Sequence, residues 1–328
     1  MLGNDCIEAV RSAIKIGYRY IDTAYLYDNQ REVGEAIKQA IAAGDVTREE
    51  LFITSKVAFY PSDSDGKNCF IHQSHHPNNR KGLETTRTAI DECLKLLQLD
   101  YVNLLLIHNP CTNHLEYEAS SAPHAFELSN NAHLYPEERD LILKHRLERA
   151  HSVWDYAKAE ASRASSWKAL EEALAAGKCR AIGVSNYPLA LLRSMESYAE
   201  VQPAVNQLEF HPTFSSPSLQ AYANSTGMVL TAYGSGNMVG IEKSPVVAAL
   251  ASARGVSPVS LILRWTLQKG AVIIPRSSKP VNQKSNLETL AIPPLTPNEM
   301  AQLDALNRAH PYYWSPMPLL PPGSLCDL

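Results

Sequence analysis

Short apolar runs alternate with segments of helical period along most of the chain. The first three runs cover residues 18–21, 51–55 and 101–107, and four more follow as CRAIGVS, AVNQLEF, MVLTAYG and AVIIP. Between the runs, apolar residues recur at the spacing of a helix face, as at Val33 and Ile37. Repeated strand, helix and strand units predict a parallel sheet with helices on the outside. The count of seven strands is one short of a closed eight-stranded barrel.

The two ends of the predicted barrel differ. At the N-terminus a helix is expected from Asp5 to Ile16, so about 25 to 30 residues of a full eight-unit barrel are missing. Strands beside that gap would keep exposed edges. Near the C-terminus, Thr296 and Glu299 form a capping box with Pro297 at the first helical position. The predicted fold class is therefore an α/β protein, a (β/α)8 TIM barrel whose first strand is missing.

Two long segments interrupt the repeat. They cover residues 59–80 and 109–165, and an irregular tail covers residues 309–328. Both segments leave from the ends of strands, so we expect large loops at the C-terminal face of the barrel that roof a pocket. Packing against the outside of the barrel is the alternative. Residues 1–328 are expected to form a single barrel domain.

Composition and charge exclude several classes of protein. The 328 residues are 45% hydrophobic, and 30 Lys and Arg against 34 Asp and Glu leave a formal net charge of -4. Because the sequence has no long run of charges of one sign, we expect a small-molecule partner and no nucleic acid. No apolar stretch reaches the roughly 20 residues that cross a bilayer, and no signal peptide is evident, so we expect a cytoplasmic protein without a membrane partner. We expect a monomer or a weak homodimer.

Cysteines and histidines raise the question of a metal site. The six cysteines lack paired spacing, which favours free thiols over a disulfide framework. The first insertion holds a cluster whose residue types suit zinc, namely Cys69, His72, His75 and His76. A solvated polar loop is the alternative, because a second ligand pair at helical spacing is missing. We therefore predict no metal.

Four polar residues lie at or just beyond strand ends, which a parallel barrel brings to one face: Asp22, Tyr27, Lys56 and His108. Reduction of a carbonyl builds alkoxide charge that needs a proton, and a phenol of pKa about 10 donates poorly unless a cation lies beside it. Lys56 could supply this cation, Asp22 could hold it charged, and His108 could bind the substrate oxygen. A structural Asp–Lys pair and a tyrosine that only caps the barrel are the alternatives, and Tyr25 is the competing phenol.

Seven motifs together resemble the aldo-keto reductases in their order and nearly in their spacing. They are GYRYIDTAYLYDNQREVGEAI, LFITSK, LDYVNLLLIHNP, KCRAIGVSNY, AVNQLEFHP, TAYGS and VIIPRSS. The resemblance covers residues 5–310 apart from the two insertions. It implies a barrel that reduces an aldehyde or ketone with an extended nicotinamide cofactor and no Rossmann domain. It also implies that Tyr27 is the general acid and that Asp22, Lys56 and His108 are catalytic.

The resemblance also implies the residues that bind the cofactor. Ser185, Asn186 and Gln207 would hold the carboxamide, and Tyr233 would stack on the nicotinamide ring. The turn that begins with Gly234 and Ser235 could approach a pyrophosphate. The adenosine end would be bound by four further residues, Arg276, Ser277, Ser278 and Asn286. Arginine suits the 2′-phosphate, so NADPH is the expected cofactor.

Departures from the family pattern leave two questions open. Asn282 and Ser285 replace an arginine and a glutamate that the family usually carries, so NADH use is possible. In the substrate pocket, Ala58 replaces a common tryptophan and Asn109 replaces a bulky aromatic residue, and Phe59 is expected as a wall. Because the first strand is missing, a noncatalytic NADPH-binding sensor and an inactive truncated reductase are alternatives to a working enzyme.

Overall fold

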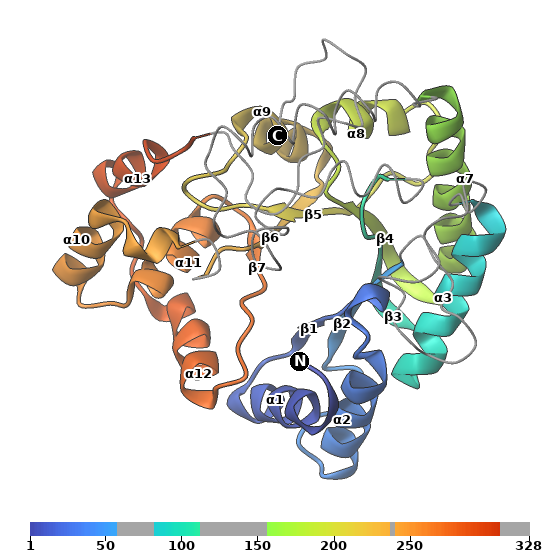
Figure 1. Ribbon diagram of the computed structural model, residues 1–328, viewed down its shortest axis with the longest axis horizontal. Coiled ribbons are helices and arrows are strands. Elements are labelled where there is room, and N and C mark those ends of the chain that lie inside the picture. Colours follow the sequence, from blue (N-terminus) through green and yellow to red (C-terminus); the bar gives the residue numbers. More distant parts are fainter. Residues whose placement is uncertain (58–81, 112–155, 237–239, 309–328) are drawn as a thin grey trace, which may run out of the picture.

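The computed structural model describes residues 1–57, 82–111, 156–236 and 240–308 (Figure 1). The predicted insertion 59–80, most of the predicted insertion 109–165 and the tail 309–328 lie outside these residues, and so does the cluster from Cys69 to His76. The described strands are β1 (Tyr20–Asp22), β2 (Phe52–Val57), β3 (Val102–Ile107), β4 (Cys179–Ser185), β5 (Val205–Glu209), β6 (Val229–Tyr233) and β7 (Val272–Ile273). The described α-helices are α1 (Gly3–Ile16), α2 (Gln30–Ala42), α3 (Leu83–Leu97), α7 (Tyr156–Ala175), α8 (Leu189–Met195), α9 (Pro217–Thr226), α10 (Pro245–Arg254), α11 (Pro258–Gln268), α12 (Pro280–Glu288) and α13 (Pro297–Asp304).

All seven strands run parallel in one sheet, in the order β1-β2-β3-β4-β5-β6-β7. Figure 1 shows the sheet curled at the centre of the molecule with the helices around it. The predicted (β/α)8 barrel that lacks one strand is therefore confirmed. In the described residues no ladder joins β7 to β1. We call this interval, together with the flanking helices α12 and α1, the seam.

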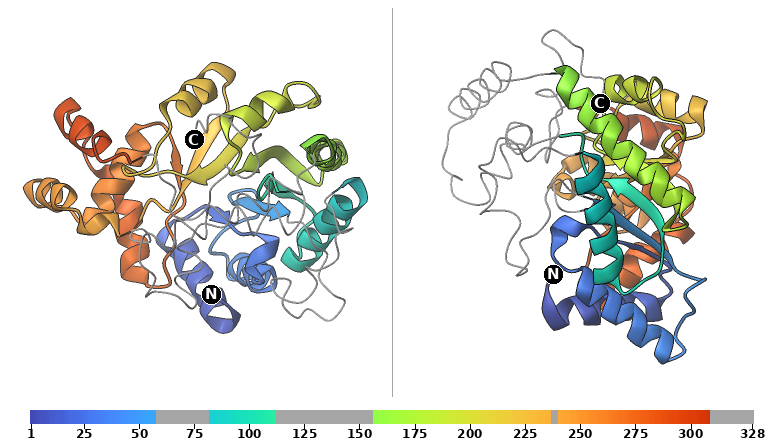
Figure 2. Two further views of the ribbon diagram at one scale, coloured as in Figure 1. Left: turned by 45° about the horizontal axis from the view of Figure 1, so that its top comes forward. Right: turned by 90° about the vertical axis from the view of Figure 1, so that its right-hand side faces the viewer.

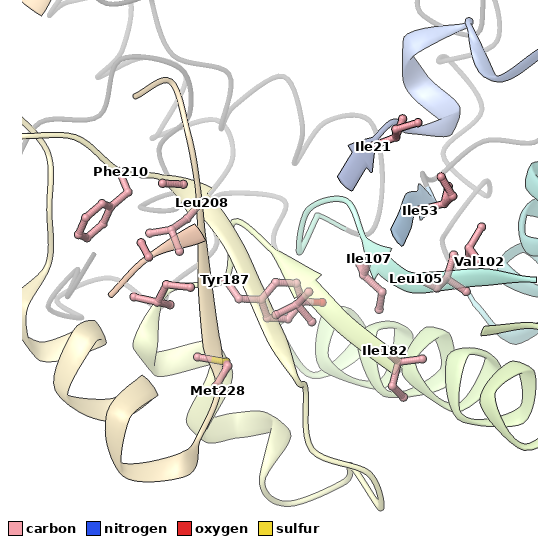
Figure 3. Close-up of a cluster of buried hydrophobic side chains, with 14 of the residues drawn as sticks. Ile21, Ile53, Val102, Leu105, Ile107, Ile182, Tyr187, Leu208, Phe210 and Met228 are labelled. Carbon is pink, nitrogen blue, oxygen red and sulfur yellow. The ribbon is translucent and has the colours of Figure 1, made fainter. Parts of the chain in front are cut away.

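Alternation along each strand separates a core face from a functional face. Outward side chains pack under the helices, and Figure 3 shows Ile21, Ile53, Leu105, Ile182 and Leu208 among them. The inward side chains are more polar, and they contact one another across different strands, as described for the site below. One face of the strands therefore builds the core under the helices, and the other face of β1, β2, β4, β5 and β6 carries polar site residues.

Helices pack closely in the half of the molecule that holds the first strands. A Cβ added at Gly34 of α2 would lie 2.3 Å from the carbonyl oxygen of Leu97, so only glycine allows α2 to approach α3 this closely. Helix α7 begins at Tyr156, inside the range predicted as an insertion, and packs against α3. Figure 2 shows α7 and α3 side by side at the edge of the molecule.

The first described helix is capped at its C-terminus, and the last is capped at its N-terminus. Helix α1 ends at Gly17, whose φ of 119° is left-handed, and whose N–H donates to the carbonyls of Ala13 and Ile14. The predicted capping box of α13 is confirmed, since Thr296 accepts from the Glu299 N–H and the Glu299 side chain accepts from the Thr296 N–H. These caps fix where the terminal helices begin and end.

Cysteines, possible metal ligands and apolar helices are the remaining features of the described residues. Four of the six cysteines lie in this part of the chain, and they are buried free thiols. The same part holds no group of three or more residues that could bind a metal ion. No single described helix has both the length and the apolar character of a membrane span, although α10 and α11 together, bent by 91°, meet that test.

Candidate active site

The sheet brings the predicted catalytic residues to one end of the barrel. Asp22 is the last residue of β1, Lys56 lies one residue before the end of β2, and His108 directly follows β3. Tyr27 ends the short 3-10 helix η1 (Tyr25–Tyr27), which Asp28 terminates with a left-handed φ of 49°. Parallel neighbours share their carboxyl ends, so these side chains meet although 86 residue numbers separate the first from the last.

Lys56 is the centre of this group. Its side chain is completely buried, and its ammonium donates to Asp22 Oδ1, to the Thr23 carbonyl at 3.2 Å and to the Tyr27 hydroxyl at 3.4 Å. An ammonium has three N–H donors, so the three partners satisfy it. Burial alone would lower the pKa of Lys56, but the Asp22 carboxylate and the Tyr27 oxygen raise it, and the pKa is higher than usual. Lys56 is therefore a fixed cation under Tyr27.

Tyr27 differs from the tyrosines near it. It is 44% exposed, and its ring meets the His108 ring edge to face at a centroid distance of 5.5 Å. The competing phenol, Tyr25, is buried and donates to a carboxylate oxygen of Glu92 on α3 at 2.7 Å. Tyr20 points inward, but it accepts from Thr54, and burial raises the pKa of its phenol to about 12. Tyr27 alone of the three is both hydrogen-bonded to Lys56 and exposed.

Asp22 links this group to the predicted nicotinamide residues. Its second oxygen accepts from Gln207 Nε2 at 2.7 Å, and the backbone carbonyl of Gln207 accepts from the Ser185 hydroxyl at 2.7 Å. The Asn186 amide nitrogen donates to Ser185 Oγ at 3.1 Å and to the His108 carbonyl at 3.0 Å. One hydrogen-bonded network therefore joins β1, β4, β5 and the end of β3.

Tyr233 extends the network to β6. Its hydroxyl donates to Asn186 Oδ1 at 2.7 Å, and Asn186 has a left-handed φ of 63° that turns its side chain back over the strand ends. The next residues turn sharply, because Gly234 has a φ of 73° and the Ser235 hydroxyl donates to the Phe210 carbonyl at 2.8 Å. Residues 237–239 of the predicted pyrophosphate turn lie outside the described part of the chain.

The predicted adenosine residues lie elsewhere, between β7 and α12 at the seam. Arg276 and Ser278 are exposed, and Ser277 is partly exposed and accepts from the Lys279 N–H at 3.1 Å. Asn286 lies on α12 and is buried. Strand β7 separates this group from the catalytic one in sequence. An extended ligand would be needed to reach both.

The predicted substrate residues are only partly described. Ala58 and Phe59 lie outside the described residues. Asn109 is buried, and its Oδ1 accepts from the Cys111 N–H at 3.2 Å, so its side chain closes the turn after β3. In the loop after β5, His211 is 1% exposed and lies between Glu209 Oε1 and Thr213 Oγ1, each at 2.9 Å. The two hydrogen bonds of its ring therefore stabilise the loop after β5.

Two contributors to the site were not found from the sequence. The Thr23 carbonyl completes the shell of Lys56, and a backbone group has no signature in the sequence. Gln283 joins α12 to α1 at the seam, and it is buried on an otherwise polar helix. A polar residue at the core-facing position of α12 is a signal that could have marked it.

Comparisons with known proteins define the class of this fold and site. The profile of the aldo/keto reductase family matches residues 3–308. The chain is 33% identical over 311 residues to aldo-keto reductase family 1 member A1 of Rattus norvegicus, covering 92% of this chain and 81% of the rat protein. It is 31% identical to the NAD(P)H-dependent D-xylose reductase of Candida tenuis, covering 95% of this chain and 89% of that protein.

Solved structures agree with the sequence comparisons. An aldo-keto reductase of Bombyx mori in complex with NADP superposes with a TM-score of 0.70 at 27% identity, covering 94% of this chain and 84% of the other. The protein belongs to the aldo/keto reductase family, as the resemblance implied. Members of this family are oxidoreductases that act on small-molecule carbonyls with NADPH, and some use NADH. The expected enzyme class and cofactor are thereby confirmed.

Proposed function

We propose that this protein reduces an aldehyde or ketone to the alcohol with NADPH and that Tyr27 is its general acid. The observation that carries the proposal is the buried Lys56 ammonium, held between the Asp22 carboxylate and the exposed Tyr27 hydroxyl. Desolvation makes a buried ion pair contribute little net stability, so stability alone does not explain why this pair lies beneath an exposed phenol. This arrangement is the one that transfer of a phenolic proton requires.

The residues of the chain divide the work of the reaction. When bound, NADPH supplies the hydride that the carbonyl carbon accepts. Tyr27 gives its proton to the carbonyl oxygen, and Lys56 stabilises the phenolate that remains. Asp22 keeps Lys56 charged, while His108, whose ring meets the Tyr27 ring, binds the oxygen and directs it toward the phenol. Because the pKa of Lys56 is raised, this cation persists throughout the neutral pH range.

The described donors and acceptors fit a nicotinamide cofactor. Ser185, Asn186 and Gln207 present hydroxyl and amide groups at adjoining strand ends, and Tyr233 presents a partly exposed ring beside them. At the other end of the site, the exposed Arg276 guanidinium suits the 2′-phosphate of NADPH. We assign the carboxamide to the first three residues, the ring to Tyr233 and the phosphate to Arg276.

Two measurements in one cuvette test the proposal. Quenching of tryptophan fluorescence measures binding of NADPH and NADH to the purified protein, and the decay of NADPH absorbance then follows a panel of aldehydes and ketones. We expect binding of NADPH and carbonyl-dependent oxidation of it. Absence of turnover with every aldehyde and ketone in the panel would contradict the proposal.

The seam favours a second candidate, a protein that binds NADPH without catalysis. In the described residues the sheet has free edges at β1 and β7, and an open barrel has lost any contact that a further strand would supply. The same experiment separates the two candidates, since a sensor would quench with NADPH and leave its absorbance constant. The cytoplasmic location and the oligomeric state expected from the sequence stay predictions.

A further inference from the structure

We propose that Gln283 is a positioning residue for the cofactor, which locks the loop from Arg276 to Ser278 against α1 across the seam and thereby favours NADPH over NADH. The proposal rests on the assignment of the 2′-phosphate to this loop. The hydrogen bonds of Gln283 lie at the seam, where the fold departs from a closed barrel. Gln283 acts through the loop from Arg276 to Ser278 and does not contact the reacting atoms.

The Gln283 side chain is 4% exposed, and every polar atom of its amide is used. Its Nε2 donates to the Ala9 carbonyl at 2.9 Å and to the Ser277 carbonyl at 3.0 Å. Its Oε1 accepts from the Ser12 hydroxyl at 2.8 Å. Two donors and one acceptor therefore hold two segments of the chain that are more than 260 residues apart.

The backbone of Gln283 is held in the same way. Its carbonyl accepts from the Tyr18 hydroxyl at 2.8 Å, and burial raises the pKa of this phenol to about 12. Tyr18 lies in the connection between α1 and β1. In the part of the chain that the structure describes, all hydrogen bonds between α12 and the segment from α1 to β1 pass through Gln283.

Placement at the seam gives these contacts their importance. Strands β2 to β6 are each fixed by ladders to two neighbours, but β7 has a described ladder only to β6 and pairs over two residues. The loop that follows β7 therefore gains little support from the sheet. Figure 1 shows α12 and α1 beside each other at the seam. Within the described residues, Gln283 makes the hydrogen bonds between them.

We call the three hydrogen bonds of the Gln283 side chain the clasp. Its bond to Ser277 holds the loop that is predicted to bind the 2′-phosphate. Ser277 is the central residue of the loop, and its carbonyl accepts directly from the Gln283 amide. Asn286, the predicted adenine contact, lies three residues further along the same helix and is also buried. A loop held in one conformation loses less entropy when it binds a phosphate, so fixing it strengthens binding of the 2′-phosphate in particular.

The variant that tests the proposal is Gln283→Leu, which keeps the approximate size of the side chain and removes all three hydrogen bonds. Calorimetry with 2′,5′-ADP and with 5′-ADP measures how much the 2′-phosphate contributes to affinity. Fluorescence titration with NADPH and NADH measures the affinity for the whole cofactor. We expect affinity for 2′,5′-ADP and NADPH to fall about tenfold, the size of one lost hydrogen bond to a buried group. Affinity for 5′-ADP and NADH should change by less than about twofold.

Gln268→Leu is the matched control. Gln268 is also a glutamine near a helix end that clasps a distant backbone, donating to the Leu295 carbonyl and accepting from the Leu295 N–H, both at 2.8 Å. Its loss should lower thermal stability and leave the ratio of NADPH to NADH affinity unchanged. If Gln283→Leu fails to fold, Ser12→Ala removes one bond of the clasp and should shift the ratio in the same direction.

The outcomes distinguish this proposal from the proposed function. A selective loss of 2′-phosphate affinity in a protein without turnover would support the role of Gln283 and refute catalysis. Equal losses for both members of each ligand pair, or no loss, would overturn the role of Gln283 while catalysis stands. If the unaltered protein binds neither cofactor and neither nucleotide, both proposals are refuted.

Discussion

At the scale of single residues, the position of one charge organises the site. Lys56 is buried on an inward face, where an ammonium without partners would be severely destabilising. Three acceptors around it make burial tolerable, and all three, from Asp22, Thr23 and Tyr27, belong to the segment around the end of β1. The same contacts place a cation beside an exposed phenol. Stability and chemistry therefore depend on the same hydrogen bonds.

Replacement of Tyr27 by phenylalanine tests the role of the phenol. Because Tyr27→Phe removes the proton donor and keeps the ring, we expect turnover to fall by about 10²- to 10⁴-fold. The affinity for NADPH, measured by fluorescence titration, should stay within about twofold of the original value. Tyr25→Phe is the matched control, since that hydroxyl bonds to Glu92 on α3 and should leave turnover nearly unchanged. Near-normal turnover of Tyr27→Phe would refute the assignment.

Arg276→Ala tests the predicted phosphate contact. Only NADPH carries a 2′-phosphate, so its affinity should fall by at least about tenfold, while that for NADH should change little. Lys178→Ala is the control, because Lys178 is an exposed cation paired with Asp91 far from α12 in sequence. Titration of both cofactors against both variants measures the effect. Equal losses of NADPH and NADH affinity in Arg276→Ala would show that the guanidinium does not read the phosphate.

At the scale of elements, caps and alternation explain why much of the fold was predictable. The run CRAIGVS corresponds to β4 residue for residue, and the capping box of α13 was expected from three residues. Both depend on neighbours in sequence. The run AVIIP predicted a longer strand than β7, because pairing needs a partner, and only Val272 and Ile273 lie opposite β6.

In the site, too, features set by residues adjacent in sequence could be predicted, and contacts between distant residues could not. The residues at strand ends could be predicted, because the end of a run and the polar residue after it are adjacent in sequence. The bond from Gln207 to Asp22 joins residues 185 positions apart, and the clasp of Gln283 on Ala9 joins residues 274 apart. No local pattern encodes such distances. The fold must be known before these contacts can be recognised.

The cap of α13 predicts a dependence of stability on pH. Hydrogen bonds from the Arg254 guanidinium, followed by those from Thr296, lower the pKa of Glu299 to about 2, against about 4.5 for the free side chain. The unfolded state therefore binds this proton more tightly, so the stabilisation is present above pH 4.5 and is lost as the pH falls toward 2. Glu299→Gln should lower the free energy of unfolding at pH 7 by about 1 kcal/mol and flatten the loss in acid.

Urea unfolding at several pH values measures this effect. Glu288→Gln is the control, because Glu288 is exposed and lies 3.9 Å from an equally exposed Lys284, so its removal should leave the pH dependence unchanged. An identical acid dependence in Glu299→Gln and the unaltered protein would contradict the role given to Glu299.

At the scale of the whole molecule, the sheet is unevenly supported. Strands β2 to β6 each pair with two neighbours, whereas β1 and β7 each pair with one in the described residues. The catalytic group lies close to the first free edge, because Asp22 belongs to β1, and the predicted phosphate group lies at the other, after β7. A cofactor bound to the assigned nicotinamide and phosphate residues would connect the network that holds Asp22 with the loop after β7. We therefore predict that cofactor binding and ordering of the seam are coupled.

Hydrogen exchange tests this coupling. Without ligand, amides of β1 and β7 should exchange faster than those of β3 and β4, which form the centre of the sheet. Saturation with NADPH at 100 times its Kd stabilises the folded state by about 2.7 kcal/mol. We expect protection to rise most in β7 and α12, because the residues assigned to the 2′-phosphate lie beside them, and in β1, because a more ordered seam restrains its free edge. NADH at the same degree of saturation should protect α12 less, since it offers no 2′-phosphate to the loop before that helix. Uniform protection across the sheet would show that the cofactor stabilises the fold as a whole and does not act through the seam.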